Sequence, residues 1–157
     1  MERRRKQKSD RASQNPFPLI TVYNRQRALP IQTASVRRLV RFIIEQKQID
    51  CQMISITFVG IRKITQIHAD FFDDPSPTDC MTFPIDNHFL GECVICPQVA
   101  LERRPHKPHE ETSRYLIHCL LHLIGYDDID KKKQAVMRKE ELRLLALARK
   151  SGCLLQA

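Results

Sequence analysis

The chain of 157 residues contains no run of about 18 apolar residues, the length that a helix needs to span a bilayer. Its basic N-terminus is followed by no apolar segment of the kind that a secretory signal requires. Glu2 and Asp10 in the same stretch argue against a mitochondrial transit peptide, because such peptides are poor in acidic residues. These absences predict a soluble cytoplasmic protein with no membrane partner.

Cysteine is also sparse, with six residues, too few for a disulfide framework in a chain of this length. Most of the six lie inside apolar runs, where reduced thiols are commonly buried. Cys93 and Cys96 have the CxxC spacing of a zinc or redox pair, but residues three apart on a strand point to opposite faces. We therefore expect reduced, buried thiols and a reducing compartment.

Acidic residues are outnumbered, with 18 Asp and Glu against 26 Lys and Arg, and the formal net charge is +8. This balance favours a polyanion as the large partner, with nucleic acid ahead of an anionic membrane surface. Six of the cations fall in residues 1–16, which contain almost nothing apolar to bury. We expect 1–16 to be a basic flexible tail that adds attraction to RNA phosphates, and 17–157 to form a single metal-binding domain.

The apolar pattern from residue 19 onward predicts alternating strands and helices, because runs of period two alternate with runs of helical period. The expected strands cover 19–24, 52–60, 80–85 and 90–97, and the expected helices cover 35–46, 61–72, 108–124 and about 129–150. The first two strands should run parallel, joined by a helical crossover. The pattern indicates an α+β fold, a single mixed sheet of about four strands with roughly five helices packed around it.

The expected helix that stops at Gly125 carries two histidines, His118 and His122, in an otherwise apolar stretch. Four residues advance a helix by about 400°, so the two side chains lie about one turn apart and nearly in line. Two buried imidazoles need strong partners, either hydrogen-bonding groups in the core or a shared metal ion. Because Gly125 turns the chain back, Asp127 or Asp128 can supply a third ligand, and three ligands with an open position are typical of catalytic zinc.

Three stretches resemble the YbeY family of metal-dependent endoribonucleases, which cut single-stranded RNA and are linked to bacterial ribosomal RNA maturation. HCLLHLIGYDDID at 118–130 is similar to the family signature H-x-x-x-H-x-x-G-Y-D-H, and PTDCMTFP at 77–84 is similar to P-T-D-V-L-S-F-P. FLGECVI at 89–95 resembles a family strand that opens L-G-D-I-x-I. The blocks follow the family order, and the resemblance covers roughly residues 18–150.

The resemblance implies one zinc ion per chain, held by His118, His122 and residue 128, and it assigns no catalytic group beyond the metal-bound water. It implies single-stranded RNA as the substrate, a ribosomal RNA precursor as the natural target, and the ribosome or ribosomal proteins as partners. The nucleophile is either the metal-bound water or the 2′-hydroxyl of the RNA, since a metal that polarises a phosphoryl oxygen serves both.

The sequence departs from the family at two positions. Asp128 stands where the family has its third histidine; a carboxylate can bind zinc, but its charge makes the ion a poorer Lewis acid and favours Mn²⁺ or Mg²⁺ more than a histidine would. Phe72 stands where the family has an arginine, and it cannot contact a phosphate by charge. Arg103, Arg104 and Lys107 precede the metal helix and are either cations of a solvated loop or RNA-binding residues that compensate.

The sequence therefore favours a zinc-dependent endoribonuclease of single-stranded RNA, acting in ribosomal RNA maturation and ribosome quality control. The alternative is a non-catalytic RNA-binding or ribosome-assembly factor with a structural metal, which the substitutions at Phe72 and Asp128 make credible. A zinc protease of the HExxH type is a weaker interpretation, because Cys119 stands where the general-base glutamate belongs.

Overall fold

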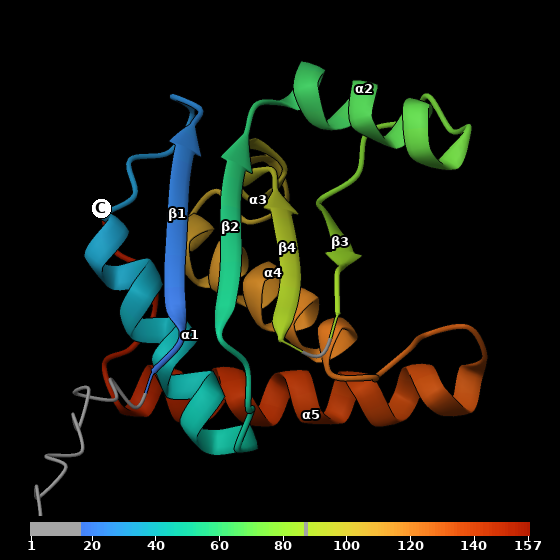
Figure 1. The fold of residues 1–157 in the computed structure, drawn as a ribbon. Coiled ribbons are helices and arrows are strands. Elements are labelled where there is room, and N and C mark those ends of the chain that lie inside the picture. Colours follow the sequence, from blue (N-terminus) through green and yellow to red (C-terminus); the bar gives the residue numbers. More distant parts are fainter. Residues whose placement is uncertain (1–16, 87) are drawn as a thin grey trace, which may run out of the picture.

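A computed structural model describes residues 17–86 and 88–157, so the expected basic tail at 1–16 lies outside the described residues (Figure 1). The strands are β1 (Leu19–Arg25), β2 (Met53–Val59), β3 (Cys80–Pro84) and β4 (Phe89–Ile95). They form one sheet in the order β1-β2-β4-β3. Because β1, β2 and β4 run parallel while β3 is antiparallel to β4, the sheet is mixed, and its first two strands are parallel, as predicted.

Five helices are described within these two ranges, which confirms the predicted α+β class. They are α1 (Thr33–Lys47), α2 (Ile61–Phe72), α3 (Pro97–Arg103), α4 (Pro108–Leu123) and α5 (Lys131–Lys150). The sequence pattern did not predict α3, because it extended the last strand to Pro97, whereas β4 ends at Ile95. Proline is favoured in the first turn of a helix, where its missing N–H is not needed. No helix in the described ranges is long and apolar enough to cross a membrane.

The central helix of the core is α4, which packs against β3 and β4 on one side and against α5 on the other (Figure 1). Six of its apolar side chains are at most 1% exposed: Tyr115, Leu116, Ile117, Cys119, Leu120 and Leu121. A helix packed on two sides has little freedom to slide or rotate, since protein interiors are close-packed. The histidines that α4 carries are therefore presented in fixed directions.

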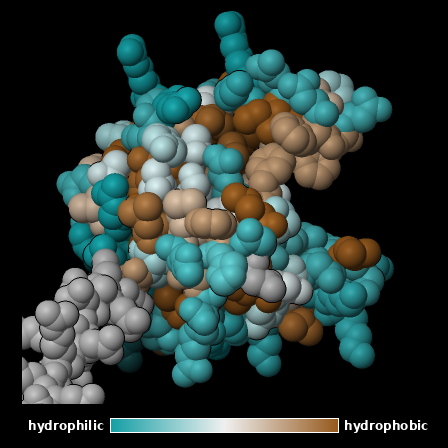
Figure 2. Space-filling model, in the orientation of Figure 1, coloured by the Kyte–Doolittle hydropathy of each residue, from teal (hydrophilic) through white to brown (hydrophobic). Residues whose placement is uncertain are grey.

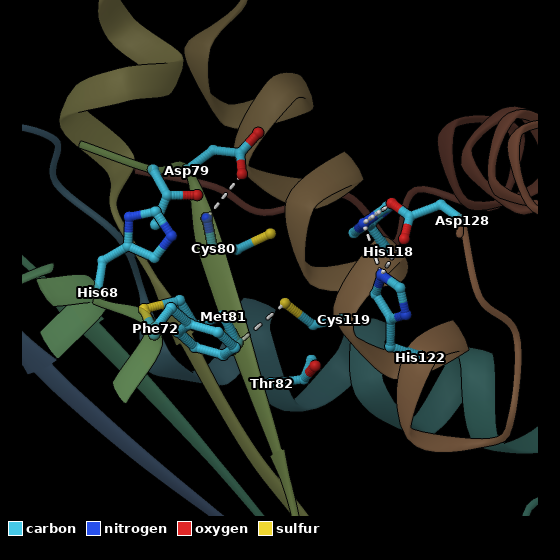
Figure 3. A pocket seen from close by; sticks show the side chains of 11 residues that line it. His68, Phe72, Asp79, Cys80, Met81, Thr82, His118, Cys119, His122 and Asp128 are labelled. Carbon is cyan, nitrogen blue, oxygen red and sulfur yellow. Dashed lines mark hydrogen bonds and ion pairs between the residues drawn. The ribbon is translucent and has the colours of Figure 1, made fainter. Parts of the chain in front are cut away.

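The end of α4 is set by Gly125, whose φ of +104° is unfavourable for a residue with a Cβ. The Gly125 N–H donates to the carbonyl of His122 (3.1 Å), and the Tyr126 N–H donates to the carbonyl of Leu121 (3.0 Å). These paired bonds are those of a Schellman motif. The chain reverses here, as the sequence predicted, and the following loop returns past the last turns of α4 (Figure 3).

Candidate metal centre

Two imidazoles from α4 face each other across one helical turn, as Figure 3 shows. Nε2 of His118 lies 3.0 Å from Nε2 of His122, and the two side chains are 26% and 24% exposed. Nδ1 of His118 is hydrogen-bonded to Oε2 of Glu141 at 2.8 Å, and Nδ1 of His122 to the carbonyl of Tyr126 at 3.1 Å. The helix sets the spacing of the two rings, and these two acceptors set their orientation.

A carboxylate from the loop after α4 completes the group. Oδ1 of Asp128 lies 3.8 Å from Nε2 of His122, and Oδ2 lies 3.9 Å from Nε2 of His118. One possible ligand atom from each of the three residues lies within 4.8 Å of the other two, and no other such group occurs among the described residues. Asp127, the alternative ligand, instead accepts a hydrogen bond from the Ile129 N–H at 3.3 Å, the turn role that the sequence also allowed.

The partners at Nδ1 determine what the two Nε2 atoms can do. A carboxylate and a backbone carbonyl only accept hydrogen bonds, so each neutral imidazole carries its proton on Nδ1. Both Nε2 lone pairs then point into the space that they share with the Asp128 carboxylate, and the 3.0 Å contact between the two Nε2 atoms needs a proton or a cation between them. Ligand atoms of a tetrahedral zinc ion lie about 3.3–3.6 Å apart when each bond is ~2.0–2.2 Å. The observed separations of 3.0, 3.8 and 3.9 Å bracket this spacing, and the donor set fits a divalent cation.

Glu141 reaches the histidines from α5, and its side chain is only 2% exposed. Besides its bond with His118, its carboxylate accepts a hydrogen bond from Nη1 of Arg114 at 2.6 Å, and Arg114 also pairs with Glu111. Burial acts to raise the pKa of Glu141, but the hydrogen bonds from His118 and Arg114 outweigh it, and the pKa is lowered. Glu141 is therefore ionised at neutral pH and holds the proton of His118 on Nδ1.

The three residues stand on one wall of a cleft of about 280 Å³, whose floor is formed by residues 78–82 at the start of β3. The opposite wall carries His68 and Phe72 from α2 (Figure 3). His68 is bonded through Nδ1 to the carbonyl of Ser76 at 2.8 Å, and it lies outside the group of possible ligands. In Figure 2 the surface is hollowed between the end of α2 and the beginning of α5. The two histidine side chains are about a quarter exposed within this cleft.

All six cysteines are free in the structure, as expected. Cys93 and Cys96 are buried, whereas Cys80 and Cys119 line the cleft. A hydrogen bond with Cys119 raises the pKa of the Cys80 thiol well above its usual value, and burial does the same for Cys119. The two thiols are therefore protonated at neutral pH and are weak nucleophiles.

Comparison with known proteins identifies the family. Residues 21–149 match the family model described as Endoribonuclease YbeY. The chain belongs to the endoribonuclease YbeY family. Proteins of that name include one from Protochlamydia amoebophila, 38% identical over 80% of this chain and 89% of its own length, and one from Chlamydia pneumoniae, 38% identical over 88% and 96%. The family resemblance inferred from the sequence is thus confirmed.

A solved structure supports the same fold. The solution structure of TM1509 from Thermotoga maritima matches with a TM-score of 0.58, covering 86% of this chain and 95% of that one. The two sequences are 21% identical, so this match concerns the fold alone.

Of the three cations named as possible RNA contacts, Arg103 is the last residue of α3, and Arg104 and Lys107 lie between α3 and α4; none of them is among the residues that line the cleft. Arg103 donates to Oδ2 of Asp79 at 2.8 Å, and Asp79 itself lines the cleft. Arg104 lies 4.0 Å from the carboxylate of Glu111, and Lys107 is the residue that precedes α4. Their role in binding RNA stays a prediction.

Sequence reasoning missed Glu141 and Arg114, the residues that hold His118 in place. Arg114 lies one turn before His118 on the same helix, and this spacing was the only local signal available. Glu141 lies 23 residues further along the chain, in a charge-rich part of α5 that resembles an ordinary solvated helix. Only the packing of α5 against α4 identifies it.

Proposed function

We propose that this chain is a zinc-dependent endoribonuclease that cuts single-stranded RNA and acts in the cytoplasm on ribosomal RNA precursors, in maturation and quality control of the ribosome. The observation that carries the proposal is the convergence of two Nε2 lone pairs, from His118 and His122, with the Asp128 carboxylate. A divalent ion bound there supplies a Lewis acid that polarises a phosphoryl oxygen and activates water. Three protein ligands leave room for the substrate at the ion.

The substrate class rests on the family and on the shape of the site. Relatives that match most of this chain are named Endoribonuclease YbeY, which supports RNA as the substrate. His118 and His122 are only about a quarter exposed, at 26% and 24%, and they stand inside the cleft. A duplex keeps its phosphates too far from a recessed group, whereas an unstacked strand can enter. The ribosome or ribosomal proteins are the partners that this role requires.

Each residue of the group has a distinct task in this proposal. Glu141 keeps the proton of His118 on Nδ1, so that Nε2 is a permanent acceptor. The carbonyl of Tyr126 does the same for His122. Asp128 adds a hard oxygen and a negative charge, which makes Mn²⁺ or Mg²⁺ better competitors for the site than they are at three histidines.

A second candidate is an RNA-binding or ribosome-assembly factor in which the metal serves stability alone. Phe72 favours it, because this side chain is 58% exposed on the cleft wall at the position where the family has an arginine. Loss of one positioned transition-state donor costs about 10²–10³ in rate. A chain that lost such a donor without compensation would bind RNA and cleave it slowly or not at all.

The deciding experiment measures cleavage of an unstructured RNA oligonucleotide and of the same sequence in a duplex. The purified chain is assayed as isolated, after chelation, and after chelation with Zn²⁺, Mn²⁺ or Mg²⁺ restored. His118→Ala removes a ligand, and His106→Ala is the matched control, since His106 is an exposed imidazole outside the cleft. We expect metal-dependent cleavage of the single strand that His118→Ala abolishes and His106→Ala retains.

Other results would point elsewhere. Cleavage that survives both chelation and His118→Ala would overturn the proposed function. Tight RNA binding without cleavage, with a melting temperature that falls when metal is stripped, would identify the second candidate. Elemental analysis should find one zinc per chain, lost in Asp128→Ala. Products ending in a 5′-phosphate would indicate water as the nucleophile, and a 2′,3′-cyclic phosphate would indicate the RNA's own hydroxyl.

A further inference from the structure

We call His118, His122 and Asp128 the metal group. A second hollow adjoins it on the side of α5. It has a volume of about 430 Å³ and shares His118 and Asp128 with the cleft. The rest of its lining comes from Arg114 and from residues of α5 between Lys131 and Glu141. We call this hollow the α5 groove. The metal group therefore stands where the cleft and the α5 groove meet. A single RNA strand that runs past the metal group along the cleft would continue into the groove.

Two cations of the α5 groove have no ion-pair partner among the described residues. Lys131 and Arg138 are both exposed, and they lie seven residues apart on α5. This spacing puts them on the same side of the helix, about 10.5 Å apart along its axis, so they can contact different phosphates. Arg114, in contrast, is only 17% exposed and is held by two glutamates. Lys131 and Arg138 are therefore the cations available to an anionic ligand.

The carboxylates near the groove are already engaged. Glu141 is buried and bonded to two donors, as described above. Asp127 lies 3.4 Å from Nζ of Lys133, and Asp130 caps α5 by accepting from the Lys133 N–H at 2.8 Å. Asp128 belongs to the metal group, where a bound divalent ion would more than offset its charge. The groove thus has a positive character that its neighbours do not cancel.

The opposite wall of the cleft has a different chemistry. No lysine or arginine occurs among the residues that line the cleft. Phe72 lines this wall and is 58% exposed, and His68 beside it has its ring centroid 5.7 Å from that of Phe72. In Figure 2 the end of α2 above the hollow is tan, whereas the α5 side below it is mostly teal. One side of the metal group therefore offers aromatic faces, and the other side offers cations.

We propose that the α5 groove binds the sugar–phosphate backbone of the single-stranded RNA substrate, with Lys131 and Arg138 as its phosphate contacts. The inference rests on the proposed endoribonuclease function and adds which side of the site holds the backbone. The two cations supply the charge that Phe72 cannot supply. With its phosphates on α5, the strand directs its bases towards the α2 wall, where aromatic rings stack on bases of any sequence.

The test compares two double variants of α5 that remove the same charge. Lys131→Ala with Arg138→Ala removes both groove cations, and Lys132→Ala with Lys139→Ala removes two exposed cations outside the groove at the same spacing. The dissociation constant for an unstructured, fluorescein-labelled RNA is measured by anisotropy in the cold at several salt concentrations. A denaturing gel checks that the RNA is intact, and thermal melting checks that each variant is folded.

We expect the groove variant to bind RNA about tenfold more weakly at moderate salt, and its log–log salt slope to fall by about 1.4, or 0.7 per lost phosphate contact. The control variant should stay within about twofold of the parent chain, because its charges do not touch the strand. The double variant Lys131→Arg with Arg138→Lys should bind RNA as the parent chain does, since it keeps a cation at both positions.

Three results would overturn the inference. Equal weakening in both variants would show a general effect of net charge. Unchanged binding in the groove variant, with cleavage by the parent chain intact, would refute the groove while the endoribonuclease function stands. No RNA binding by the parent chain even at low salt would refute both proposals.

Discussion

Removal of the charge on Glu141 is the sharpest test of how the metal group is built. Glu141→Gln keeps the shape of the side chain but removes its negative charge. The one remaining oxygen cannot accept the hydrogen bonds of both His118 and Arg114. The amide has an NH₂ group in place of one carboxylate oxygen. This donor faces another donor, either the Nδ1–H of His118 or the guanidinium of Arg114. Because the side chain is 2% exposed, water cannot replace the lost acceptor.

The magnitude follows from the two bonds that are lost. Removing a partner that orients a metal-binding histidine typically lowers metal affinity about 10- to 100-fold, or ~1.4–2.7 kcal/mol. The loss of a charge-assisted hydrogen bond to Arg114, which is only 17% exposed, lowers the free energy of unfolding by roughly 2 kcal/mol. For a chain of this size that corresponds to a melting temperature about 4–8 °C lower.

The neighbouring glutamate provides a matched control. Glu140 pairs with Lys47 at 3.0 Å and with Arg143, away from the histidines. Glu140→Gln therefore removes the same charge one residue away and leaves the contacts of His118 intact. Zinc affinity is measured by competition with a chromophoric chelator, and stability by thermal melting with and without zinc. An affinity of Glu141→Gln within twofold of the parent chain would refute the positioning role, whatever its melting temperature.

The remaining predictions concern the third ligand, the cleft wall, a tight packing point and acid stability. Asp128→His should bind zinc more selectively over Mg²⁺ in metal competition and should shift the pH profile of cleavage towards lower pH, since a neutral ligand leaves more charge on the ion; an unchanged profile would contradict this. Phe72→Arg should raise RNA affinity in anisotropy titrations, with a steeper salt dependence of about 0.7 in log–log slope if the new cation reaches a phosphate; an unchanged slope would show that it does not. Gly91→Ala should lower the melting temperature by several degrees, because a Cβ at this φ of +148° would lie 2.5 Å from the carbonyl oxygen of Phe83. The hydrogen bond from Arg143 lowers the pKa of Glu140 to about 2, so its stabilisation is complete above the usual carboxyl pKa and is lost as the pH falls towards 2; urea titrations of Glu140→Gln should show less acid sensitivity in that window, and equal sensitivity would contradict it.

The sequence predicted the main elements because their signals are local. The stripe Val36, Leu39, Val40 and Ile43 repeats at helical spacing, and the alternation in β2 buries Ile54, Ile56 and Phe58 on one face. Such periods are carried by neighbouring residues and need no knowledge of the rest of the chain. Helix α3 was missed because its seven residues are too few to show a period, and because Pro97 follows the last strand without a break.

The metal group also has parts that local sequence predicted and parts that only packing determined. The spacing of His118 and His122 and the stop at Gly125 are properties of one helix, and they were sufficient to predict a shared site with an acid from the following loop. The residues alone left Asp127 and Asp128 open as the third ligand, the family resemblance implied residue 128, and the return of the loop brings Asp128 to the histidines. Glu141, 23 residues away, and the groove cations Lys131 and Arg138 were determined only by the packing of α5 across α4. The angle and register of that packing arise from buried contacts spread over both helices, so no short stretch of sequence encodes them.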